Sequence, residues 1–158
     1  MNRKSEDARY LHLIERRLAL VRELRDVLLK SRDAIVSMNL EETDRRTCEQ
    51  ERLCAQIRVT DANLAAAQSA RAQQSGRPKQ LGLSWISTQA DDPAIIAKIR
   101  ESMGALGELR IEVRKINAIN RSLIRRSSRT LNALVNFVNG FAPTYSDPKA
   151  ALQPRGRF

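Results

Sequence analysis

Glycine, proline and aromatic residues are scarce in this sequence of 158 residues. It contains six glycines, five prolines and only 4% aromatic residues. A shortage of turn-forming residues disfavours folds built from many short strands and favours long helices with an aliphatic core. No apolar run approaches the roughly 18–20 residues that a transmembrane helix needs. Charged residues crowd the first ten positions, where a signal peptide would carry an apolar stretch. The composition therefore predicts a cytoplasmic, helical protein.

Groups that bind metals or act as nucleophiles are also few. Cys48 and Cys54 lie six residues apart, about 9 Å along a helix axis, so they cannot form a local disulfide. His12 is the single histidine and has no cysteine nearby, so no zinc-ligand spacing exists. The sequence has no glycine-rich phosphate loop, and acidic pairs such as Glu41 and Glu42 occupy helix-capping positions. We expect no enzymatic activity, no cofactor, no metal and no small-molecule substrate.

Positive charge is concentrated in the second half of the chain. The formal net charge is +10. Residues 1–75 carry 14 basic and 12 acidic side chains, whereas residues 76–158 carry 14 basic and only six acidic ones, a net charge of +8. No acidic residue occurs between Val113 and Ser146. This imbalance indicates a positive field directed at a partner.

Apolar residues recur at helical spacing in three segments. The first, over about residues 5–38, carries a stripe broad enough to pack against two neighbours. Asn39 with Glu42 three residues later is typical of a helix N-cap, so a second helix is predicted over 40–74. A continuous helix over 5–74 is the alternative. Asp92 followed by Pro93 predicts the start of a third helix, which extends to residue 139.

These segments predict an all-α fold, an antiparallel bundle of three long helices with a long amphipathic C-terminal helix and a disordered tail. A single domain would cover residues 1–146, with a loop over 75–92 and the tail over 147–158. We assign Leu106 to Ile116 to the bundle core. The later apolar stripe, Ile124 to Phe141, either completes the core or meets a partner, because the third helix is about 15 Å longer than the first.

The basic, amphipathic region after residue 110 has three interpretations. Nucleic-acid binding would use the seven basic residues from Arg110 to Arg129, but this stretch lacks aromatic residues that stack on bases and any known motif. Membrane binding would use the stripe from Ile124, but its last turns carry no cations. A protein partner would contact the stripe while the arginines orient it. We expect no stable nucleic-acid or membrane binding.

Two asparagines precede the apolar stripe. Asn117 and Asn120 lie three residues apart and share one helix face. Asn120 falls at a heptad core position, where a buried amide sets pairing register at a cost in stability. A solvated asparagine pair is the alternative.

Three sequence elements, in this order, resemble those of the FlgN-type flagellar export chaperones. They are the stretch Asn39–Glu42 with its continuation through Gln50 to Leu53, the segment Ile116–Ile124 with the spacing Asn-x-x-Asn-x-x-Leu-Ile, and Tyr145 after an amphipathic run. The similarity extends to about residue 147. It departs after Tyr145, where Ser146-Asp147-Pro148 stands in place of the glycine common in the family.

The resemblance implies a cytoplasmic helical chaperone without ATPase activity. Such chaperones bind the C-terminal segments of the hook–filament junction proteins FlgK and FlgL, prevent their premature assembly and deliver them to the export-gate protein FlhA. The amphipathic C-terminal helix takes the substrate, which here implies a binding face formed by Asn117, Asn120, Ile124, Leu131, Leu134, Val135, Val138 and Phe141. Tyr145 is the implied docking residue for the export gate. The alternative is a basic helical nucleic-acid-binding or coiled-coil scaffold protein.

Overall fold

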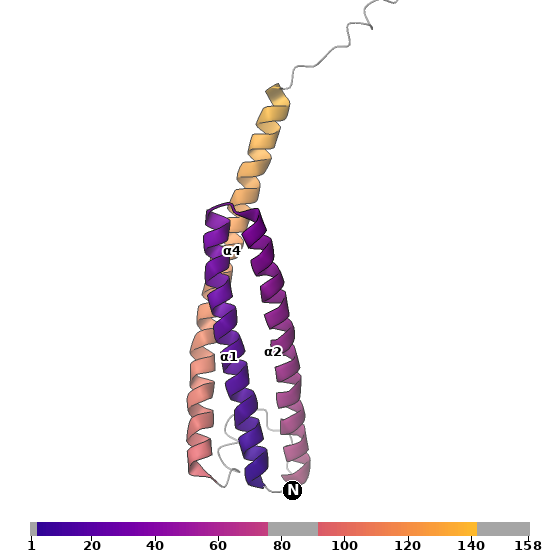
Figure 1. Cartoon of the computed structure of the whole chain (residues 1–158), viewed down its shortest axis with the longest axis vertical. Helices are drawn as coiled ribbons and strands as arrows, with labels where there is room; N and C mark the ends of the chain where they lie inside the picture. Colours follow the sequence, from indigo (N-terminus) through magenta and orange to yellow (C-terminus); the bar gives the residue numbers. More distant parts are fainter. Residues whose placement is uncertain (1–2, 76–91, 142–158) are drawn as a thin grey trace, which may run out of the picture. The chain divides into compact units, whose positions relative to one another are not determined.

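Three helices account for nearly all of the part of the chain that the structure describes, residues 3–75 and 92–141. The computed structural model has α1 over Arg3–Val36, α2 over Leu40–Ser75 and α4 over Pro93–Phe141 (Figure 1). No strand occurs among these residues. The prediction of an all-α fold is confirmed, and the helix ends lie within two residues of those expected from the sequence.

The chain forms two compact units, residues 1–123 and residues 124–158. The first contains α1, α2 and the first part of α4, and the second contains the last turns of α4. The single domain over 1–146 and the disordered tail over 147–158 stay predictions. The expected loop over 75–92 falls largely on residues 76–91, which, like the tail, lie outside the described residues.

Within the first unit the helices run up, down and up. Figure 1 shows α2 antiparallel to α1 and the first part of α4 parallel to α1. The cross-helix contacts agree, since Arg25 of α1 meets Glu112 of α4 and Leu28 meets Asn120. A short turn joins α1 to α2, so these two helices pack their apolar faces against each other. The first part of α4 packs into the same core and completes the three-helix bundle.

The core of this unit draws buried side chains from all three helices. The main cluster comprises Tyr10, Ile14, Leu18 and Val21 on α1, Leu64 on α2, and Ile99, Leu106 and Leu109 on α4. Leu20, Val27 and Leu53 form a second cluster, in which Leu53 is 0% exposed. Because Leu106, Leu109 and Ile116 are all buried, the assignment of the segment from Leu106 to Ile116 to the core is confirmed.

Small side chains set the spacing between α1 and α2. Among the described helices these two form the closest backbone pair. The last turns of α2 are rich in alanine from Ala62 to Ala70. The distance between packed helices depends on the side chains at the contact, so alanine lets the two backbones approach, whereas long aliphatic side chains separate them from α4.

A Schellman turn separates α1 from α2 and excludes the continuous-helix alternative. The Asn39 N–H donates to the carbonyl of Ala34 at 3.0 Å, and the Met38 N–H donates to that of Ile35 at 3.2 Å. Met38 has a φ of 54°, the left-handed conformation that this motif requires. Asn39 then caps α2, because its side-chain oxygen accepts the Glu42 N–H at 3.0 Å.

Candidate protein-binding site

The last turns of α4 present large apolar side chains to solvent. Ile124, Leu131, Leu134, Val135 and Val138 have exposed fractions between 48% and 64%. Their spacings of three, four and seven residues place them on one side of the helix. Exposed apolar residues elsewhere in the described chain are scattered singly or sit at the α1–α2 turn, so this stripe is the largest run of its kind along one described helix. A contiguous exposed apolar surface marks an interaction site.

Phe137 widens this stripe and was not among the residues predicted from the sequence. Its side chain is 63% exposed. It lies three residues after Leu134 and four before Phe141, so it flanks the same face. A strict heptad pattern assigns the apolar position to Val138, so it does not select the neighbouring Phe137. We call the set Ile124, Leu131, Leu134, Val135, Phe137 and Val138 the apolar stripe; the side chain of Phe141 lies outside the described residues.

Asn120 does not belong to an exposed face. Its side chain is 5% exposed, and its amide nitrogen donates to the backbone carbonyl of Leu28 at 2.9 Å. It follows Ile116 by four residues, on the side of α4 that α1 covers. The predicted buried amide at a heptad core position is therefore confirmed for Asn120, and the solvated alternative is wrong. Its part in substrate binding stays a prediction, although its amide is held inside the bundle in this structure. Asn117 is half-buried, and its part in binding stays a prediction.

The polar side of the same helical segment is strongly basic. Arg125, Arg126 and Arg129 are exposed. The nearest acidic residues in the sequence are Glu112 before them and Asp147 after them. Nothing within this stretch of sequence neutralises the three guanidinium groups, so they add a positive field to the apolar stripe.

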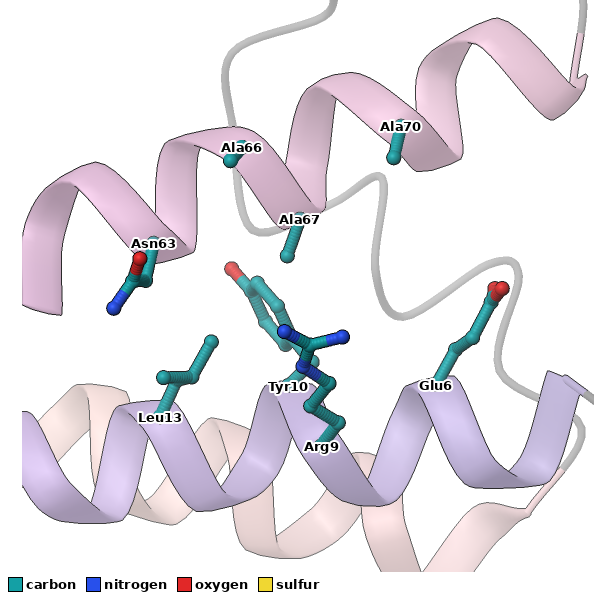
Figure 2. A pocket seen from close by; sticks show the side chains of 8 residues that line it. All are labelled: Glu6, Arg9, Tyr10, Leu13, Asn63, Ala66, Ala67 and Ala70. Atoms are coloured by element: carbon teal, nitrogen blue, oxygen red, sulfur yellow. The ribbon is translucent and has the colours of Figure 1, made fainter.

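A hollow between α1 and α2 is the main concave feature described. It has a volume of about 270 Å³ and is lined by Glu6, Arg9, Tyr10, Leu13, Asn63, Ala66, Ala67 and Ala70 (Figure 2). The Gln68 amide donates to the Tyr10 hydroxyl at 2.8 Å. Burial raises the pKa of Tyr10, and the hydrogen bond from Gln68 opposes this shift. Glu6 and Arg9 also line the hollow, but the Tyr10 hydroxyl is bonded to the Gln68 amide and, among the described residues, not to a base, so we assign no reaction to the hollow.

Comparison with known proteins identifies the family. A family model described as FlgN protein matches residues 1–152. The chain belongs to the FlgN family. The resemblance inferred from Asn39–Glu42 and Ile116–Ile124 is thus confirmed. No curated protein and no solved structure matched the chain.

FlgN membership assigns the chain to the chaperones of flagellum biogenesis that bind hook-associated proteins, a family without known enzymatic activity. The match spans α1, α2, α4 and the position of Tyr145, which lies outside the described residues. The described residues contain no cluster of histidine, cysteine or acidic side chains able to hold a metal ion. No helix in the described part has the length and hydropathy to cross a membrane.

Proposed function

We propose that this FlgN-family chaperone holds the C-terminal segment of a hook–filament junction protein, of the FlgK or FlgL type, on the apolar stripe of α4. One observation carries the proposal: six large apolar side chains between Ile124 and Val138 are exposed on one helix. An amphipathic segment that is still unassembled needs its apolar side covered, and a complementary helical stripe provides that cover. Phe141 extends the stripe by one turn in the sequence.

The stripe supplies a substantial part of the free energy of binding. Complete burial of a valine, leucine or phenylalanine side chain contributes about 1.5–3 kcal/mol. The six side chains are already partly covered by their own helix, so each adds roughly half of that on binding, about 5–9 kcal/mol in all. The cost of association is on the order of 4–15 kcal/mol, so a stable complex also needs burial of apolar side chains of the bound segment. Loss of two central members should therefore be measurable.

The chaperone would act in the cytoplasm and deliver its bound protein to the FlhA-like export gate. Tyr145 follows the apolar stripe and is the residue proposed to contact the gate. Separate positions for substrate and gate fit a carrier that must hold one protein while it docks on another. The resemblance to the FlgN pattern supports this division of roles.

Leu134→Asp combined with Val138→Asp tests the binding face. Each aspartate places a charge where an apolar surface must be desolvated, so we expect the dissociation constant for a junction-protein C-terminal segment to rise about 100-fold or more. Titration calorimetry with the full chain and a synthetic segment measures this change. Circular dichroism checks that the helices remain formed.

Val59→Asp combined with Ile111→Asp is the matched control, because both side chains are exposed outside the stripe, Val59 at 62% on α2 and Ile111 at 56% on α4. The control should bind the segment as the parent chain does. Unchanged binding by the Leu134/Val138 double variant would show that the substrate lies elsewhere. Equal weakening by the control and the double variant would point to a general charge effect.

A further inference from the structure

Three arginines form a cluster on the side of α4 opposite the stripe residues Ile124, Leu131, Leu134, Val135 and Val138. Each residue of an α-helix turns about 100°, so Arg125, Arg126 and Arg129 lie roughly 100°, 200° and 140° around the axis from Ile124. Phe137 lies at roughly 220°, between the edge of the stripe and Arg126. All three arginines are exposed. A segment bound along those five apolar residues would therefore leave Arg125 and Arg129 uncovered.

Several arginines of the first unit, though not all of them, are paired with acidic side chains. Arg17 pairs with Asp61 at 2.7 Å, and Arg46 pairs with Glu42 at 2.7 Å and Glu49 at 2.8 Å. Surfaces that face only solvent commonly mix the two signs in this way. Within the described ranges 3–75 and 92–141, no ion pair involves the arginines at 125, 126 and 129. The chain thus maintains a local excess of positive charge without compensating it.

We propose that Arg125, Arg126 and Arg129 form a second contact surface, which binds an acidic protein surface while the apolar stripe holds its own segment. The claim that both surfaces are occupied at once rests on the proposed function of the stripe. The contact between the arginines and an acidic surface does not depend on that function. Guanidinium groups form bidentate hydrogen bonds with carboxylates, and three within five residues match a row of aspartate or glutamate side chains. The cluster is the positive half of a charge-complementary interface.

Neighbouring residues favour a protein over other anionic partners. Asn132 and Asn136 follow on the same side of the helix, are exposed, and supply neutral donors and acceptors that suit a polypeptide surface. Phe137 is the single aromatic residue from 124 to 140, too few to stack on successive bases. A helix that lies on an anionic membrane carries cations alongside its apolar face, but the sequence has none from Thr130 to Pro148.

A charge-matched comparison tests the cluster. The triple variant Arg125→Gln, Arg126→Gln, Arg129→Gln keeps good helix formers and removes three charges. Its control is Arg16→Gln, Arg22→Gln, Arg58→Gln, which removes three exposed charges that have no ion pair among the described residues. The probe is poly-L-glutamate, titrated into the full chain at low salt. We expect the first variant to bind about fivefold more weakly than the control, since each exposed charge pair contributes modestly.

Titrating poly-L-glutamate into the chain already saturated with a junction-protein segment distinguishes a failure of this proposal from a failure of the proposed function of the stripe. Poly-L-glutamate should still bind, and a neutral Leu134→Gln/Val138→Gln variant should bind it as the parent chain does even though this variant holds the segment more weakly. Equal weakening by both triple variants would overturn the proposal, as would displacement of poly-L-glutamate by the segment. A larger dependence on these arginines for duplex DNA, or for phosphatidylserine vesicles, would overturn the assignment to a protein.

Discussion

Asn120 places a polar amide inside the unit formed by residues 1–123. Its nitrogen is bonded to the Leu28 carbonyl, but its side-chain oxygen is buried with no hydrogen-bond partner among the described residues. The Leu28 carbonyl lies within α1 and already accepts a helical hydrogen bond. The amide therefore fixes which turn of α4 lies against which turn of α1, at the expense of one unsatisfied acceptor.

Asn120→Leu should raise the free energy of unfolding by about 1 kcal/mol, because it removes the unsatisfied buried acceptor and adds apolar contact. Urea titration followed by circular dichroism measures the change. Asn120→Asp is the opposing control and should destabilise the chain by about 2–4 kcal/mol, since it buries a carboxylate without a cation. A destabilising leucine would mean that the amide contributes more than its one hydrogen bond.

Tyr10 makes the stability of the first unit sensitive to alkaline pH. Burial holds its pKa above the ordinary value of 10.0. The phenol of the unfolded chain therefore loses its proton first, so stability is fully present below that value and is lost as pH rises toward the folded-state pKa. We expect the unfolding free energy of the parent chain to fall, relative to Tyr10→Phe, as pH rises above the ordinary tyrosine pKa of about 10. Parallel curves for the two proteins would contradict this origin of the loss.

At the scale of the helices, the turn between α1 and α2 combines one favourable residue with one strained residue. Asn39 caps α2 with its side chain, as its position in the sequence indicates. Met38 occupies the left-handed position, which is usually filled by glycine, and its side chain is 59% exposed. The N-cap pattern predicted where α2 begins. The left-handed conformation of Met38 could not be predicted from the residue type, because a non-glycine residue adopts it only where the surrounding hydrogen bonds stabilise it.

Met38→Gly should stabilise the hairpin of α1 and α2. A left-handed conformation costs a non-glycine residue about 1–2 kcal/mol, and the greater freedom of glycine in the unfolded chain offsets part of that gain. We expect a net increase of about 0.5 kcal/mol in the unfolding free energy, read from urea titration. Met38→Val, with a β-branched side chain at the same position, should instead destabilise the turn. If glycine and valine act alike, strain at this residue is not significant.

Across the whole chain, the sequence predicted the fold more completely than the site. Helix periodicity and capping residues determine where the three helices begin and end, so these were predictable from local pattern. The mismatch in helix length left two possibilities for Ile124 and Leu134, burial in the core or contact with a partner, and the structure has both side chains exposed. Periodicity placed Asn120 at a core position, as the structure has it, whereas the resemblance placed it on the binding face. Phe137 was missed because it flanks the stripe instead of repeating within it.

The structure distinguishes the basic side chains that have acidic partners from those that have none among the described residues. In the first unit, ion pairs between and along the helices engage several of the basic side chains, such as Arg17 with Asp61 and Arg52 with Glu23. The basic excess of residues 76–158 includes Arg125, Arg126 and Arg129, which have no such partners among the described residues. If both proposals hold, an acidic partner and an apolar segment would bind on opposite sides of one helix.

Tyr145→Ala tests whether docking at the export gate is separable from substrate binding. The residue lies within the matched range 1–152 but beyond the apolar stripe. We expect the dissociation constant for the junction-protein segment to stay within about twofold of the parent value, because no contact of the stripe is removed. Secretion of the junction protein should fall about tenfold or more, as expected when a central aromatic contact is truncated. Titration calorimetry and immunoblotting of the culture medium measure the two effects.

Tyr145→Phe keeps the ring and should retain most secretion if the ring is the docking element. Loss of segment binding by the alanine variant would instead place Tyr145 in the substrate site, and normal secretion would remove it from the gate contact.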